Sequence, residues 1–193
     1  MAFEPVPGMR TKVSDSPDGL SFVVPAPRVI VAMVFIPVWL AGWFLGEIAA
    51  LFTLVAGNKP DQLSLVFWLT AWTIAGAVTT FVWLWMLSGR ERILLKPGAL
   101  AHRYELFNLS VGREYDLAQV RNLRVSPQPL LTGNGRYMFR TLGLSGGVVA
   151  FDYGAHTIRM GGLIDEPEGN MIVHTIQQWY SIASAIRDLK ERG

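Results

Sequence analysis

The sequence predicts an α+β membrane protein, in which a transmembrane helical hairpin precedes a domain of seven short strands and one C-terminal amphipathic helix. The first observation is compositional: 51% of the 193 residues are hydrophobic and 17% are charged, whereas soluble domains carry about 25% charged residues. The second is that the segment between Arg28 and Arg90 contains only Glu47, Lys59 and Asp61 as charged residues. The third is that apolar residues after Arg90 first alternate, as in strands, and then adopt a helical period.

Residues 1–28 contain prolines and mixed charges but no helical apolar period. We therefore expect an extended cytoplasmic tail, in which Ser21–Val24 could add a strand to another element. A cleaved signal peptide is not expected, because the apolar run starts only at Val29 and exceeds the length of a signal-peptide core.

The predicted hairpin occupies residues 29–88. Its two spans, about 29–57 and 63–87, each exceed the roughly 20 apolar residues that a helix needs to cross the hydrocarbon core. Pro37 lies within the first span and is expected to kink it. The connection between the spans is so short that they should be antiparallel neighbours.

Basic residues flank both outer ends of the hairpin, whereas the connection between the spans holds only Lys59. Cytoplasmic loops are enriched in lysine and arginine. We therefore expect a two-span protein of the bacterial inner membrane, with both termini in the cytoplasm. The flanking basic residues are Arg10, Lys12, Arg28, Arg90, Arg92 and Lys96.

Residues 89–193 predict one cytoplasmic α+β domain. Turn residues separate the expected strands, which are 92–96, 99–106, 113–116, 121–125, 137–144, 148–153 and 156–160. A helical apolar period then predicts a helix from about Glu168 to Lys190. On this helix we expect Trp179, Ile182 and Ile186 to close the open end of the strands, against residues that include Leu123 and Phe151.

Three segments carry a resemblance to a known family: Gly89-Arg90-Glu91 directly after the second span, 115–125 (YDLAQVRNLRV), and Phe151-Asp152-Tyr153-Gly154. With the two spans before them, they resemble bacterial membrane proteins that have a two-helix anchor followed by a bacterial pleckstrin-homology-like (PH-like) domain. The resemblance implies a seven-stranded PH-like barrel or sandwich capped by a C-terminal helix. The family is largely uncharacterised, so the resemblance brings no catalytic residues.

Small residues recur at four-residue steps in both spans, as Gly42 and Gly46 in the first and Ala71 and Ala75 in the second. Small residues let helices approach closely in lipid, where van der Waals packing drives association. Counting outward from the turn places the two stripes at the same depth, so we expect them to close the hairpin. The alternative is that Gly42-x-x-x-Gly46 mediates dimerisation.

Glu47 is the ionisable residue deep within the first span. A carboxylate in a membrane is costly, at about 2.5 kcal/mol or more, and should have a partner. The same counting places Glu47 opposite Thr73 and beside Trp72, so we expect a structural hydrogen bond. The alternative is a small transporter component in which Glu47 moves protons or ions.

Tryptophans are concentrated in the hairpin, where Trp39 and Trp43 share one face and Trp68 and Trp72 share another. The simpler interpretation is contact with lipid and packing within the hairpin. The alternative is that these indoles contact other helices, lipids or pigments in a larger complex.

No catalytic, cofactor-binding or metal-binding residues are predicted. The chain contains no cysteine, which excludes disulfides, thiolate metal sites and cysteine nucleophiles. His102, His156 and His174 lack the spacing of metal ligands. The net charge of +2 gives no indication of nucleic-acid binding. We therefore expect a protein that is not an enzyme.

The function expected from these features is that of a non-enzymatic accessory or structural subunit, which stabilises or assembles a larger complex with other integral membrane proteins. An energy-converting complex, such as a photosynthetic reaction-centre–antenna complex, would suit the tryptophan-rich spans, and a homo-oligomer is also compatible. The alternative is a membrane-tethered module that senses anionic lipid headgroups. Its candidate contacts are Lys96, Arg103, Arg136 and Arg140.

Overall fold

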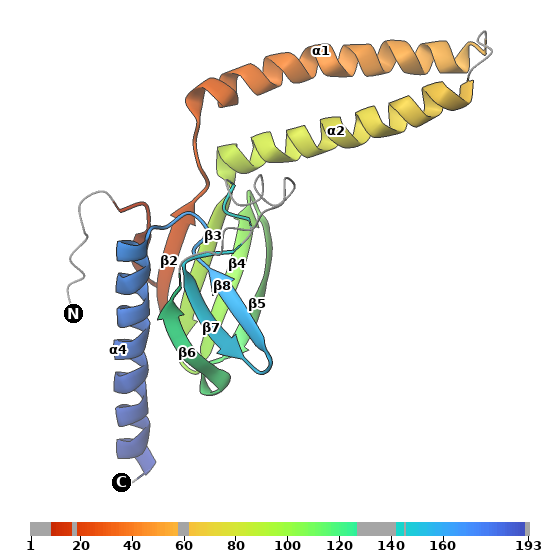
Figure 1. The fold of residues 1–193 in the computed structure, drawn as a ribbon. Helices are drawn as coiled ribbons and strands as arrows, with labels where there is room; N and C mark the ends of the chain where they lie inside the picture. Colours follow the sequence, from red (N-terminus) through yellow and green to blue (C-terminus); the bar gives the residue numbers. More distant parts are fainter. Residues whose placement is uncertain (1–8, 17–18, 58–61, 127–141, 145, 192–193) are drawn as a thin grey trace. The chain divides into compact units, whose positions relative to one another are not determined.

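The computed structural model describes residues 9–16, 19–57, 62–126, 142–144 and 146–191, with the backbone alone at Ser16, Gln62 and 182–191. The chain forms two compact units (Figure 1). Residues 28–87 form a helical unit, and residues 1–27 and 88–193 together form a second unit of strands and one helix.

The helical unit consists of α1 (Ile30–Val55) and α2 (Gln62–Ser88). Both helices are long and apolar enough to cross a membrane. Their first and last residues differ by at most two positions from those of the predicted spans, because an uninterrupted apolar run fixes the limits of such a helix. Pro37 lies inside α1.

The larger sheet has five antiparallel strands in the order β1-β2-β3-β4-β5. They are β1 (Lys12–Ser16), β2 (Gly19–Pro25), β3 (Arg90–Lys96), β4 (Ala99–Leu106) and β5 (Leu109–Asp116). The expected strand at Ser21–Val24 is therefore present as part of β2. Its partner is β3, on the far side of the hairpin in sequence.

This arrangement differs from the predicted extended tail, since Lys12–Ser16 and Gly19–Pro25 belong to the sheet. The physical reason is the alternation of Phe22 and Val24, which are buried at 0% and 1% exposure and face the core. Glu168 fixes the preceding residues: its carboxylate accepts hydrogen bonds from the Arg10 N–H and the Thr11 hydroxyl, at 2.6 and 2.8 Å.

The smaller sheet has three antiparallel strands, β6 (Val120–Val125), β7 (Val149–Tyr153) and β8 (His156–Met160). A short 3-10 helix, Leu117–Gln119, connects β5 to β6. The pairing of β6 with β7 shifts register between Arg121 and Arg124. Of the strand predicted at 137–144, residues 137–141 lie outside the described residues, and residues 142–144 are not in a strand.

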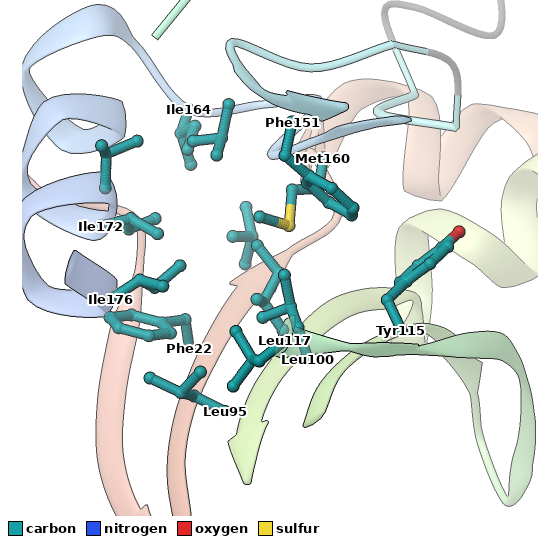
Figure 2. Close-up of a cluster of buried hydrophobic side chains, with 14 residues drawn as sticks. Phe22, Leu95, Leu100, Tyr115, Leu117, Phe151, Met160, Ile164, Ile172 and Ile176 are labelled. Atoms are coloured by element: carbon teal, nitrogen blue, oxygen red, sulfur yellow. The ribbon is translucent and has the colours of Figure 1, made fainter. Parts of the chain in front are cut away.

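The core lies between the two sheets and α4 (Glu166–Glu191), the C-terminal helix. Figure 2 shows Ile172 and Ile176 of α4 directed toward Phe22, Leu95 and Leu100 of the larger sheet, with residues of the smaller sheet nearby. Phe151 and Met160 of the smaller sheet are fully buried in the same cluster.

The predicted C-terminal helix is thus present, and its partly buried Trp179 packs against the core as expected. The side chains of Ile182 and Ile186 lie outside the described residues. Asp165 caps the helix by accepting a hydrogen bond from the Glu168 N–H at 2.9 Å.

Candidate functional site

Four indole rings form a continuous row across the helical unit. Trp43 of α1 stacks on Trp72 of α2, with ring centroids 3.7 Å apart and planes 16° from parallel. Trp39 extends the row on α1 and Trp68 extends it on α2, each at 4.5 Å. The two central rings are partly buried, whereas Trp39 and Trp68 are 40% and 43% exposed. The row therefore closes the hairpin at its centre and reaches the outer surface at both ends.

Gly76 of α2 makes room for this stack. A Cβ added at Gly76 would lie 2.8 Å from Nε1 of Trp43, which is closer than van der Waals contact allows. Leu40 of α1 and Leu69 of α2 are buried as well, at 5% and 6% exposure. Together with the indoles they form the contact surface between the two helices, which is called the seam below. The seam between the helices is thus made of aromatic and large aliphatic side chains, with one glycine beneath an indole.

The predicted contact of Glu47 is present. The Thr73 hydroxyl donates a hydrogen bond to the Glu47 carboxylate across the two helices. The same hydroxyl lies 2.9 Å from the Leu69 carbonyl of its own helix, and because it has a single hydrogen, these two acceptors compete. The contact gives the Glu47 carboxylate the hydrogen-bond partner that a carboxylate within a membrane would require.

The small residues do not close the hairpin, which corrects our prediction. Gly42, Gly46, Ala71 and Ala75 are all exposed, and nothing lies within 4 Å of a Cβ built on either glycine. Each lies one residue, or about 100° around the helix, from a residue of the seam. Counting from the turn predicted the depth of these residues but could not predict the face.

Thr73 is the threonine bonded to Glu47 in the described part of the spans, and the other threonines do not extend this contact into a polar path. Within the described residues, the hydroxyls of four of them donate to carbonyls of their own helices, four residues earlier. They are Thr53, Thr70, Thr79 and Thr80. This arrangement gives no support to the transport alternative, which requires several polar groups in sequence.

Two of the four expected headgroup contacts, Lys96 and Arg103, lie in the described part of the chain. Lys96 and Arg103 share the exposed carboxylate of Glu114, at 3.0 and 3.9 Å, and their charges are therefore partly neutralised. Arg136 and Arg140 lie outside the described residues.

A buried polar cluster around Glu91 was not predicted. Glu91 is 3% exposed, and its carboxylate accepts hydrogen bonds from the N–H groups of Gly161 and Gly162 at 2.8 and 3.0 Å. His102 Nε2 lies 2.7 Å from Glu91 Oε1. Burial, and then the charge of Glu91, raises the pKa of the Tyr104 phenol well above its usual range. The cluster joins β3 and β4 to the turn after β8.

The sequence did contain a signal for this cluster. Glu91 is in phase with Ile93 and Leu95 on β3, which are both fully buried, so strand alternation places its side chain toward the interior. A carboxylate at such a position needs hydrogen-bond donors, and two consecutive glycines supply unobstructed backbone N–H groups. The arrangement is that of a structural anchor for the turn.

A second charged cluster lies on the surface of the smaller sheet. Asp152 accepts hydrogen bonds from Arg124 and Asn122 at 3.0 Å and from Thr157 at 2.8 Å. These donors, Arg124 first, lower the pKa of Asp152 to about 2. Asn122 has a positive φ of 52° and lies at the register shift between β6 and β7. Its hydrogen bond to Asp152 of β7, together with that of Arg124, therefore holds the irregular part of β6 on β7.

No family model, curated protein or solved structure matches the chain. The resemblance to membrane-anchored PH-like proteins therefore remains a proposal. Within the described part of the chain, no group of three or more histidine or acidic side chains is placed to hold a metal ion.

Proposed function

We propose that the chain is a membrane-anchored, non-enzymatic accessory subunit, whose two helices pack against other integral membrane proteins. The observation that carries the proposal is the exposure of Gly42, Gly46, Ala71 and Ala75 on the outer faces of a hairpin that other residues already close. Small residues on an exposed helix face permit close approach of another helix in lipid.

The pairing of β2 with β3 supports an anchor in which both outer ends of the hairpin lie on one side of the membrane. Pro25 and Arg90 are direct partners in the sheet, and the Ala26 N–H donates to the Gly89 carbonyl at 2.9 Å. The chain therefore leaves the sheet and returns to it at neighbouring points, which requires an even number of crossings. The flanking basic residues favour the cytoplasmic side of a bacterial inner membrane.

The second unit is proposed to be a PH-like domain that serves as the cytoplasmic docking module of the subunit. Two antiparallel sheets with a C-terminal helix against their common core support this assignment. The N-terminal segment gives the accessory role no added support, because its strands β1 and β2 complete the sheet of their own unit.

The test compares two substitutions at adjacent positions of α1. Gly42→Leu adds bulk on the small-residue face, whereas Ala41→Leu adds bulk about 100° around the helix, at another exposed position. The full chain, expressed in its own membrane and extracted in mild detergent, should migrate as part of a larger particle. We expect Gly42→Leu to release the chain from that particle and Ala41→Leu to leave it bound.

If both variants and the unmodified chain migrated in the same particle, the result would contradict the proposal that this face of α1 contacts another membrane protein. If the purified chain alone reproduced the particle size, the face would join copies of the chain to one another. That result would replace the accessory role by a homo-oligomer.

A further inference from the structure

The hairpin between β4 and β5 exposes an apolar tip that the proposed function does not use. Leu106 and Leu109 are partners across a two-residue connection, Phe107-Asn108. Phe107, Leu109 and Val111 are 57%, 70% and 73% exposed. Apart from Tyr180, they are the exposed large hydrophobic side chains in the described part of their unit. Such a local concentration marks an interaction surface.

The residue at the apex is unusual for its backbone conformation. Phe107 has a φ of +51°, in the left-handed region where glycine, asparagine or aspartate is favoured in two-residue hairpin connections. A bulky aromatic residue is strained there. The connection would form more readily with a small polar residue, so folding of the hairpin does not explain the phenylalanine.

The tip lies at the end of the sheet from which the chain continues into both apolar helices. Arg90, the first residue of β3, pairs with Glu105 on one side and with Pro25 on the other. Phe107 is two residues beyond Glu105, or about 7 Å at 3.3 Å per residue. In sequence, Ser88 of α2 is also two residues from Arg90. The tip therefore lies about two residues beyond the row that contains Arg90, at the end of the sheet from which the chain leaves toward α1 and α2.

The charges at this end of the sheet complement an anionic surface. Arg90 and Arg92 share the carboxylate of Glu105, at 2.5 and 3.2 Å, and the neighbouring carboxylate of Glu91 is buried at 3% exposure, so the exposed charge of these residues is positive. Arg28, just before α1, is exposed as well. Lys96, by contrast, pairs with Ala99 at the opposite end of the sheet. Basic residues close to a bilayer are attracted to anionic headgroups at about 1 kcal/mol each.

We propose that the β4–β5 tip docks on the bilayer that α1 and α2 cross, with Phe107 and Leu109 inserted among the lipid headgroups and Arg90 and Arg92 facing lipid phosphates. The inference rests on the helices crossing a membrane and is independent of the accessory role. Docking would hold the second unit against the lipid surface in a single orientation.

Single-cysteine labelling tests this proposal directly, because the chain contains no cysteine. Phe107→Cys and Leu109→Cys place a polarity-sensitive fluorophore at the tip. Ala118→Cys, an exposed position of the 3-10 helix whose first residue is bonded to Gly98 at the opposite end of the sheet, is the matched control. The full chain is reconstituted in vesicles of phosphatidylcholine and phosphatidylglycerol, some carrying spin-labelled lipids that quench nearby fluorophores.

We expect a blue-shifted emission and strong quenching by shallow spin labels at positions 107 and 109, and neither effect at 118. Replacing phosphatidylglycerol by phosphatidylcholine should reduce the quenching at the tip. Water-like emission at all three positions would overturn the proposal. Blue-shifted but unquenched emission at the tip would also overturn it, since a second copy of the chain, and not lipid, would then cover the tip.

A label at Leu45→Cys, on the exposed face of α1, separates this inference from its premise. Quenching of this label by deep spin labels verifies that α1 crosses the bilayer. Its absence would overturn both the anchor and the docking, whereas quenching at 45 with none at the tip overturns the docking alone.

Discussion

The two units of the chain differ in where their large hydrophobic side chains lie. In the helical unit, large hydrophobic residues such as Val38, Leu45 and Phe67 are 69–77% exposed, while the seam contains indoles and the Glu47–Thr73 hydrogen bond. In the second unit, the interior is aliphatic and aromatic. This difference indicates that two balances of forces act in one chain. Hydrophobic burial stabilises the second unit. In the proposed membrane anchor, packing and polar contacts would hold α1 and α2 together, because lipid provides no hydrophobic driving force between helices.

The largest expected difference between the two units is their response to a shortened hydrophobic side chain. Phe151→Ala removes a fully buried ring and should lower the free energy of unfolding of the second unit by about 3–5 kcal/mol. Phe44→Ala, on an exposed face of α1, should change the stability of either unit far less, because this ring is 44% exposed and lies outside the Trp43–Trp72 stack. Chemical unfolding of the full chain in detergent, followed by circular dichroism, measures both; equal effects would contradict the comparison.

The next largest effect should come from the polar group buried in the second unit. Glu91→Gln keeps the shape of the side chain but replaces one acceptor oxygen by a donor, so at least one buried N–H group loses its acceptor. We expect destabilisation by about 1–3 kcal/mol in the same unfolding assay. Glu114→Gln is the control, since that carboxylate is 45% exposed; a Glu91→Gln effect no larger than the control would show that the cluster is not a structural anchor.

The polar contact of the helical unit should contribute less. Thr73→Val removes the donor to Glu47, and interhelical hydrogen bonds in membranes contribute about 0.6 kcal/mol on average and at most about 1.7. Thr79→Val is matched, because the Thr79 hydroxyl donates within its own helix. Tryptophan fluorescence of the stacked indoles during denaturation with a harsh detergent reports separation of the helices. Greater stability of Thr73→Val than of Thr79→Val would contradict the role of the contact.

The smallest effect is a dependence of stability on pH. The pKa of Asp152 is lowered from 3.8 to about 2 in the folded chain. The contribution of Asp152 to the free energy of unfolding is therefore fully present above pH 4 and is lost as the pH falls toward 2. Asp152→Asn should remove this part of the pH dependence from the unfolding curve. Thr157→Val, which removes one hydrogen-bond donor to Asp152, should shift the pH range in which this stabilisation is lost only partly toward pH 4. An unchanged pH dependence in Asp152→Asn would refute the assignment.

The sequence predicted the features that depend on composition and on distance along the chain. The spans follow from uninterrupted apolar runs, and the Glu47–Thr73 contact follows from counting outward from a short turn. The same counting misplaced Gly42 and Ala75, because depth does not determine which face of a helix meets its neighbour. The large indoles of Trp43 and Trp72 decided that face through their stacking.

The features that sequence reasoning missed depend on pairing between distant segments. Nothing near Gly19–Pro25 indicates that the partner of this strand is Arg90–Lys96, since strand alternation predicts a buried face but no partner. The buried role of Glu91 likewise depends on Gly161 and Gly162, which approach it only after both sheets have formed.

The position of the hairpin between β2 and β3, which are neighbours in the sheet, determines the order in which the chain can fold during synthesis. β2 leaves the ribosome before both helices, and its partner β3 leaves after them. Phe22 and Val24 can therefore pair with β1, but β2 must remain without β3 on its other edge until α1 and α2 have been made. A strand edge left without its partner is prone to aggregation. The synthesis of α1 and α2 thus sets the delay before the larger sheet can be completed.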